Sequence, residues 1–324
     1  MSIGVFETPS FPTNNRIVTS WFPKQERARA IAIYTSGQYM GLAILTPSLI
    51  AIQSWVGWRG LFIASGVIGL IWAGVWYTFY RDPLDHKGVN EAELNYIKKG
   101  GALVNKGREE KKAKWDWREL KYAFQFRKLW GIYIGQFCIG ATFIFFLTWF
   151  PTYLVKYRGM DFLQSGFLAS IPFIAAFFGV LSSGFISDTL VNRGYSTAVA
   201  RKAPVIIGMF LSTTIIGANY VDSSFLLITF LSIAFFGNGF ASITWVFVSA
   251  MAPERLIGLI GGVFNFMGGL SAIIVPAAIG FLVTDDNFSP ALIFIAILTF
   301  IGLLSFIFLV GKIERIAIPE SSTT

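Results

Sequence analysis

Residues 291–310 have the sequence ALIFIAILTFIGLLSFIFLV, a run of twenty residues without a single charge. At about 1.5 Å per residue, a helix of this length crosses the roughly 30 Å hydrocarbon core of a membrane. Seven similar apolar runs precede it, each bounded by charged or turn-forming residues. The expected spans are 30–52, 60–80, 129–152, 163–187, 204–221, 225–250, 258–283 and 289–311. This pattern predicts an all-α, polytopic membrane protein.

The composition of the whole chain agrees with that prediction. Of the 324 residues, 54% are hydrophobic and 14% are charged, whereas soluble domains carry about a quarter charged residues. The single cysteine, Cys138, lies inside an apolar run, so no disulfide can form within the chain. The net charge is +8, but the basic residues gather in short segments between apolar runs, as is typical of membrane topology. We therefore expect a lipid bilayer as a partner, and no nucleic acid.

The distribution of basic residues predicts which loops face the cytoplasm. When alternate loops are assigned to opposite sides, one set holds 23 of the 26 basic residues. By the positive-inside rule, this set is cytoplasmic. It includes a long basic linker, residues 81–128, and a C-terminal tail, residues 312–324. The linker separates residues 1–80, expected to belong to an N-terminal helix bundle, from residues 129–311, expected to form a six-helix bundle.

A short repeat relates the two sides of the linker. Glu26-Arg27 and Glu254-Arg255 each precede a span rich in small residues. When the two pairs are aligned, Gln38 falls one residue from the position of Asn265, so each span carries an amide at a similar depth. Parallel repeats of this kind are typical of transporters built from two bundles, with the binding site between them.

Polar residues also recur along the span 225–250. Asn238, Ser242, Trp245 and Ser249 are separated by four, three and four residues, so a straight helix would present them on one face. Polar groups at membrane depth are costly unless they bond to neighbouring helices or line a wet cavity. Both alternatives are open for each residue alone. For the set, together with Asn265, lining of a cavity is the favoured interpretation.

Glu7 is an acidic residue in a weaker apolar stretch, residues 1–19, which has the length of about half a span. It could be solvated, because it lies seven residues into the chain. Alternatively, it could be buried, where an apolar surrounding favours the neutral carboxyl and lets it take up and release a proton near physiological pH.

Six segments together resemble the anion:cation symporters of the major facilitator superfamily. They are FETPSFP (6–12), WFPKQER (21–27), YTSGQ (34–38), FLTWFP (146–151), FFGNGFASITW (235–245) and GGVFNF (261–266). Within that family, the combination is most similar to bacterial sugar-acid:proton symporters. Gly184, Asp188, Arg193 and Gly194 also resemble the loop motif of the superfamily, in which an aspartate and an arginine latch neighbouring helices on the cytoplasmic side.

The resemblance implies a function and roles for particular residues. It implies proton-coupled symport of a sugar-acid anion, such as D-galactonate, by alternating access, in the inner membrane and with the proton as the only coupling agent. Glu7 would couple the proton, and Asp188 and Arg193 would form the latch. The residues that would contact the substrate are Gln38, Ser242, Thr244, Trp245 and Asn265.

One departure from the family pattern affects these expectations. The first three spans and the start of a fourth have no counterpart in the sequence, nor do the basic residues that the family carries there. We therefore expect the chain to be a fragment, a sequence with a mis-assigned start, or the product of a decayed gene. A carboxylate needs a positive partner in a low-dielectric cavity, so we expect this chain alone to bind an anion poorly.

The sequence also allows other substrates and a protein that does not transport. The same fold could carry glucarate, a hexuronate or an aromatic carboxylate, or the protein could be a membrane sensor or remnant that transports nothing. An enzyme is not expected, because no span carries a cluster of histidine, cysteine and carboxylate residues with the spacing of metal ligands. No phosphate-binding glycine loop is present, so ATP is not the expected source of energy. We expect a monomer without a bound cofactor.

Overall fold

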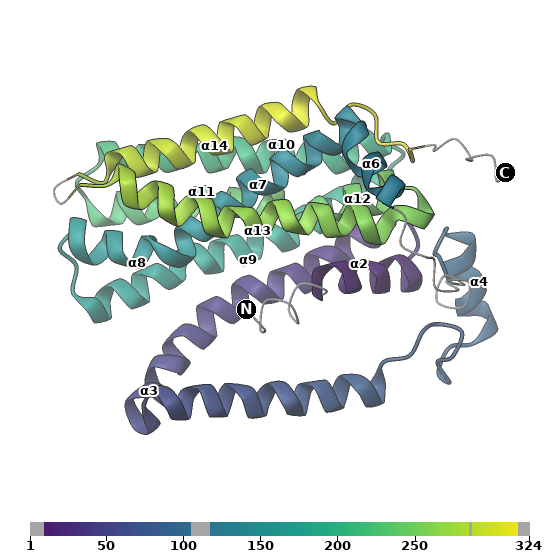
Figure 1. Ribbon diagram of the computed structural model, residues 1–324, viewed down its shortest axis with the longest axis horizontal. Coiled ribbons are helices and arrows are strands. Elements are labelled where there is room, and N and C mark those ends of the chain that lie inside the picture. Colours follow the sequence, from purple (N-terminus) through teal and green to yellow (C-terminus); the bar gives the residue numbers. More distant parts are fainter. Residues whose placement is uncertain (1–9, 105–116, 285–286, 317–324) are drawn as a thin grey trace.

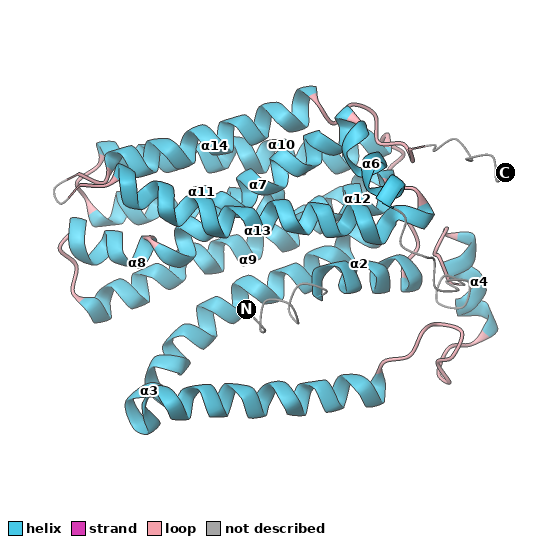
Figure 2. Cartoon of the chain, viewed as in Figure 1, coloured by secondary structure: helices cyan, strands magenta, loops and turns pink. Residues whose placement is uncertain are grey.

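The structure, a computed structural model, describes residues 10–104, 117–284 and 287–316. Throughout these ranges the regular secondary structure is helical (Figures 1 and 2). Seven helical segments are long and apolar enough to cross a membrane. The all-α, multi-spanning prediction is therefore confirmed.

The helix boundaries lie close to the expected spans. Short 3-10 or π turns continue several of the helices. The elements are α2 (Ser10–Trp21), α3 (Arg27–Phe79), α4 (Glu91–Lys99), α6 (Trp117–Gln125), α7 (Arg127–Thr148), α8 (Phe150–Thr152), η1 (Tyr153–Tyr157), α9 (Phe162–Asn192), α10 (Thr197–Ser212), η2 (Thr213–Tyr220), α11 (Ser224–Ala241), η3 (Ser242–Thr244), α12 (Trp245–Met251), η4 (Glu254–Leu256), α13 (Ile257–Leu282) and α14 (Ser289–Phe308).

The helices from α7 to α14 lie side by side as one bundle (Figure 1). Helix α7 packs against α13 and α14, while α11 packs against α9 and α10. Aromatic rings fill the centre of this bundle; for example, Phe146 of α7 stacks on Phe235 of α11 with 4.0 Å between the ring centroids. The two N-terminal helices lie along the bundle, with α3 against α9 and α2 against α13. The division into domains at residues 80 and 128 stays a prediction.

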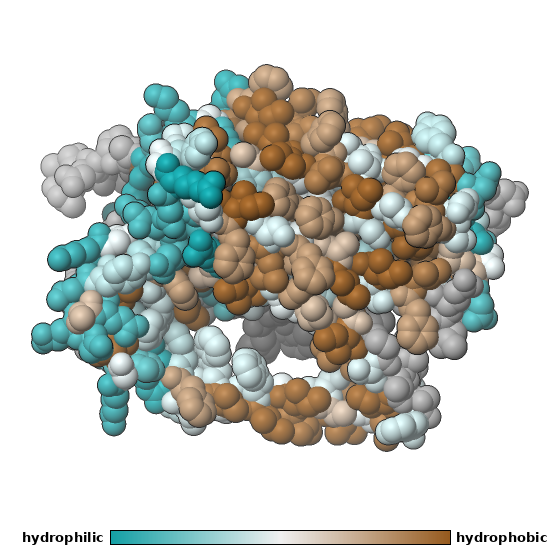
Figure 3. Space-filling model, turned by 180° about the vertical axis from the view of Figure 1, so that it is seen from behind, coloured by the Kyte–Doolittle hydropathy of each residue, from teal (hydrophilic) through white to brown (hydrophobic). Residues whose placement is uncertain are grey.

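Helix α3 joins two expected spans into one bent element. Gly57 adopts φ 69°, a conformation that residues other than glycine rarely take, and the chain reverses there. The limb before Gly57 packs against α9, whereas the limb Trp55–Phe79 has no buried residues in its apolar window. Figure 3 shows an opening between this second limb and the rest of the molecule. The expected span 30–52 is helical as part of the first limb, but it is not among the seven candidate spans found within the described residues.

Part of the expected linker folds against the loop between α2 and α3. The side chain of Asn90 accepts a hydrogen bond from the backbone N–H of Glu93 and so caps the start of α4. After α4, the carbonyl of Gly100 accepts from the N–H of Lys24, and the carbonyl of Gly101 accepts from the guanidinium of Arg27, both at 2.9 Å. This end of the molecule is hydrophilic, and a broad hydrophobic surface lies next to it (Figure 3).

Candidate functional site

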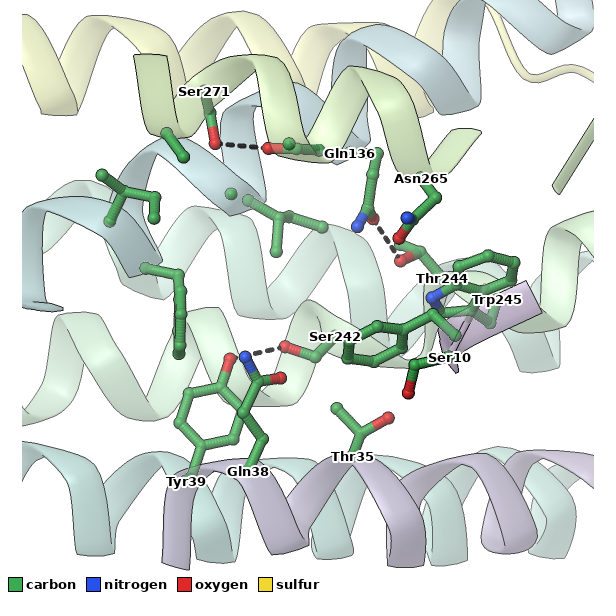
Figure 4. A pocket seen from close by; sticks show the side chains of 18 residues that line it. Ser10, Thr35, Gln38, Tyr39, Gln136, Ser242, Thr244, Trp245, Asn265 and Ser271 are labelled. Carbon is green, nitrogen blue, oxygen red and sulfur yellow. Dashed lines mark hydrogen bonds between the residues drawn. The ribbon is translucent and has the colours of Figure 1, made fainter. Parts of the chain in front are cut away.

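A cavity of about 590 Å³ lies between α2 and α3 on one side and the α7–α14 bundle on the other. Its volume is in the range of pockets that hold small molecules. Side chains from both sides point into it (Figure 4). The lining residues are Ser10, Phe11, Thr35, Gln38, Tyr39, Gln136, Ile139, Gly140, Phe143, Ile144, Ser242, Thr244, Trp245, Asn265, Gly268, Gly269, Ser271 and Ala272.

All five residues expected to contact a substrate line this one cavity. They come from four elements: α3 supplies Gln38, η3 supplies Ser242 and Thr244, α12 supplies Trp245, and α13 supplies Asn265. The two amides paired by the internal repeat, Gln38 and Asn265, therefore enter it from helices on opposite sides of the linker. The structure brings the set together, while the role of each residue stays a prediction.

The straight helical face expected from Asn238 to Ser249 is wrong. A 3-10 turn, Ser242–Thr244, interrupts the helix, and Ile243 has a non-helical ψ of 16°. Ser242 and Trp245 line the cavity as a result, whereas Asn238 and Ser249 are buried outside its lining. Ser249 donates a hydrogen bond to the carbonyl of Val246 within its own helix. Ser242 and Trp245 thus line the cavity, while Asn238 and Ser249 form hydrogen bonds inside the protein.

Sequence reasoning missed several polar residues of the lining. Gln136 of α7 accepts a hydrogen bond from the Thr244 hydroxyl at 2.8 Å, so it holds a predicted substrate residue in place. The signal was present, because Gln136 is an amide inside an apolar span. Tyr39 and Thr35 belong to α3 and flank the predicted Gln38 along it. Their positions beside Gln38 in sequence could have suggested them.

Trp245 forms one wall of the cavity and is held between two phenylalanine rings. It stacks on Phe11 of α2 with an interplanar angle of 6°, and Phe264 of α13 meets it edge to face at 4.9 Å. Only 3% of Trp245 is exposed. Its ring is therefore rigidly placed, and it ties α2 to the bundle beside the polar groups.

The chemistry of the described lining is neutral. Hydroxyl and amide groups alternate with aromatic and aliphatic side chains, and none of the lining residues named above carries a charge. Hydroxyls and amides both donate and accept hydrogen bonds, so they suit a ligand with many hydroxyl groups. Among the described residues, no three histidine, cysteine or acidic side chains lie together in a group that could hold a metal ion.

A buried ion pair joins α3 to the bundle at the end that carries α4. Asp188 of α9 pairs with Arg201 of α10, and its other oxygen accepts from the backbone N–H of Arg29 at 2.7 Å. Arg201 also donates to the carbonyl of Lys24, in the loop before α3. An acceptor in the first turn of a helix satisfies a free N–H and interacts favourably with the helix dipole. Asp188 therefore connects three helices.

The other residues expected to act with the site have different positions. Arg193 is exposed at the turn after α9, and the arginine that pairs with Asp188 is Arg201. A contribution of Arg193 to the latch stays a prediction. Glu7 lies outside the described residues, three positions before Ser10, which lines the cavity.

Comparison with known families identifies the family to which the fold belongs. The model of the Major Facilitator Superfamily matches residues 1–276, which is most of the chain. The chain belongs to the major facilitator superfamily. A solved superfamily structure, the proton:xylose symporter XylE bound to 6-bromo-6-deoxy-D-glucose, shares the fold with a TM-score of 0.66 at 14% identity. That match covers 93% of this chain and 67% of the symporter.

Relatives within the superfamily are much more similar in sequence. The D-galactonate transporter of Escherichia coli O6:H1 (strain CFT073) is 51% identical over 97% of this chain and 73% of its own length. The probable galactarate/D-glucarate transporter GudP of Escherichia coli (strain K12) is 41% identical over 98% of this chain and 71% of its own length. These relatives are transporters and not enzymes. The protein is thus a multi-pass membrane transporter of this superfamily.

Proposed function

We propose that this protein carries a sugar-acid anion, D-galactonate or a related aldonate, across the inner membrane together with protons. The observation that carries the proposal is the 51% identity to a D-galactonate transporter along 97% of the chain. The neutral cavity between α2, α3 and the bundle supports it, because a sugar acid offers a row of hydroxyls to hydroxyl and amide partners. The substrate would bind there as a small-molecule carboxylate, and the protein would act as a monomer.

Each predicted residue has a place in this mechanism. Gln38, Ser242, Thr244 and Asn265 would bond to the hydroxylated chain, and Trp245 would present an apolar surface to its carbon atoms. The described lining carries no positive charge, so it would recognise the hydroxyls rather than the carboxylate. Alternating access would require the contacts between α3 and α9 around Asp188 to open and close, with Arg193 as a further member of the latch.

Glu7 would couple this movement to protons. Its neutral form would be favoured while the site is closed to water, and its charged form when water enters. The proton is the only coupling ion in this cycle, and the cycle needs no cofactor. The basic linker and the C-terminal tail would face the cytoplasm, as the positive-inside rule predicts.

A second candidate substrate is a dicarboxylic sugar acid, galactarate or D-glucarate. It is favoured by the relatives at 41% and 39% identity, whose names give these compounds. A hexuronate or an aromatic carboxylate would use the same fold. The dicarboxylic acids carry a second carboxylate where D-galactonate has a terminal hydroxyl, so direct competition for uptake distinguishes them.

The test is uptake of labelled D-galactonate into vesicles that contain the protein expressed from its natural gene. We expect accumulation against a gradient that collapses when a protonophore is added, and we expect Glu7→Gln to abolish it while binding persists. Accumulation that survives the protonophore would contradict proton coupling. Stronger competition by D-glucarate than by unlabelled D-galactonate would favour the second candidate. Absence of flux with every sugar acid would support a sensor or a nontransporting remnant instead.

A further inference from the structure

Three polar groups meet where α3 approaches α11 beside the cavity. The Tyr39 hydroxyl lies 3.0 Å from Oδ1 of Asn238 and 2.9 Å from Oγ of Ser242. Ser242 Oγ also lies 2.8 Å from the backbone carbonyl of Asn238. Tyr39 and Ser242 line the cavity, whereas Asn238 is 2% exposed and lies behind them. Figure 4 shows Tyr39 and Ser242 on facing elements of the site.

The orientation of the Asn238 amide follows from its other contact. Its Nδ2 donates to the carbonyl of Ile139 on α7 at 2.9 Å. Oδ1 therefore faces Tyr39, and it can only accept a hydrogen bond from the tyrosine hydroxyl. The Tyr39 ring is fixed as well, since Phe143 and Phe235 pack against it with centroid distances of 5.5 and 5.4 Å.

The three contacts share only two hydroxyl protons. Tyr39 and Ser242 each supply one hydroxyl proton, yet three contacts link them to each other and to the two oxygens of Asn238. One contact is therefore an oxygen facing an oxygen without a proton between them. Both hydroxyl protons are thus used within the group, so the Tyr39 and Ser242 oxygens offer the cavity only lone pairs, which can accept a hydrogen bond from a ligand.

A hydroxyl of a sugar acid can donate this hydrogen bond, whereas an ionised carboxylate can only accept. We propose that Tyr39 is a specificity-determining residue, which with Ser242 accepts a hydrogen bond from one hydroxyl of the substrate and keeps the carboxylate away from this part of the cavity. This inference rests on the proposed transport of a sugar acid. It adds a residue from α3 to the recognition of the hydroxylated chain, and it assigns Asn238 the task of orienting the tyrosine.

The experiment measures binding of D-galactonate and of its monodeoxy analogues by calorimetry to the purified protein expressed from its natural gene, with the native sequence and with Tyr39→Phe. The substitution keeps the packed ring and removes only the hydroxyl. We expect Tyr39→Phe to weaken D-galactonate binding about tenfold. We also expect one analogue, which lacks the hydroxyl that bonds to Tyr39, to bind the native protein and Tyr39→Phe equally well.

Tyr133→Phe is the matched control. Tyr133 is also a fully buried tyrosine, and its hydroxyl has no partner among the described residues. It lies on α7 beside Phe124 and Trp130 and does not line the cavity. Its substitution should leave binding unchanged for every analogue, and an equal loss in Tyr133→Phe would overturn the proposal.

The remaining outcomes separate the two claims. If the native protein binds D-galactonate but Tyr39→Phe weakens all monodeoxy analogues by one common factor, the assignment of Tyr39 is wrong and the proposed function stands. If the native protein binds neither D-galactonate nor D-glucarate, the proposed function fails, and the role of Tyr39 in reading a sugar hydroxyl fails with it.

Discussion

Helix α3 contacts the bundle in two regions, one held by a buried ion pair and the other by neutral polar groups. Around Asp188 the contact consists of a buried ion pair, a capped helix end and small residues that let the backbones approach. About three turns further along α3, Tyr39 meets Ser242. The contact there consists of neutral hydroxyls and amides that border a cavity. Charge is thus placed where the helices must hold each other, and neutral groups are placed where a hydroxylated ligand must enter and leave.

The ion pair should show the largest effect on stability. Asp188→Asn would leave the Arg201 charge buried without a counter-charge, since the two side chains are 0% and 3% exposed. We expect a loss of about 3–5 kcal/mol in unfolding free energy, measured by thermal or denaturant unfolding in detergent. Replacing both residues, as in Asp188→Asn with Arg201→Met, should recover part of it. A single variant as stable as the native protein would show that the pair does not hold α3.

The close approach of α3 and α9 should give the next largest effect. A Cβ added to Gly184 would lie 2.4 Å from the Cβ of Ala32 and 2.7 Å from the carbonyl of Ala28. We expect Gly184→Val to lower the unfolding free energy by about 1–3 kcal/mol, because the helices must separate. Gly258→Ala is the control, since a Cβ there meets nothing within 4 Å. Equal stability of the two variants would contradict the close contact.

In the cavity, the expected effect is on binding rather than on folding. Gln136→Leu removes the partner of the Thr244 hydroxyl but keeps a side chain of similar size. We expect D-galactonate to bind about tenfold more weakly, while the unfolding midpoint changes much less than in Asp188→Asn. Titration calorimetry measures the first quantity. A large loss of stability with unchanged binding would show that Gln136 serves packing and not the ligand.

The smallest effect should come from the surface of the linker. The Tyr96 hydroxyl of α4 donates to the Glu26 carboxylate, and this neighbour raises the pKa of the Tyr96 hydroxyl. Because the pair is exposed to solvent, we expect Tyr96→Phe to leave the unfolding free energy nearly unchanged. A change as large as that of Gly184→Val would mean that docking of the linker supports the α3 contact.

Much of this molecule could be predicted from its sequence, for identifiable reasons. Apolar runs indicate which segments are helical, and the amides Gln38 and Asn265 stand out because polar groups at membrane depth are rare. The 3-10 turn at Ser242–Thr244 was not predicted, because it contains neither proline nor glycine and the preceding glycine, Gly239, lies within α11. The pairing of Asp188 with Arg201 was also hidden, since it depends on how α9 and α10 pack and not on a local motif.

The central claim is that a sugar acid occupies the cavity between α3 and the bundle, and alkylation of a cysteine placed in its wall tests that claim most directly. Gly269 lines the cavity, and a Cβ there meets nothing within 4 Å, so Gly269→Cys should present a reactive thiol. The native Cys138 is buried and should react little.

We predict that D-galactonate slows alkylation of Gly269→Cys in a concentration-dependent way. It should not affect Gly66→Cys, on the second limb of α3, where a Cβ also meets nothing within 4 Å. Equal alkylation of Gly269→Cys with and without saturating D-galactonate or D-glucarate would contradict the account.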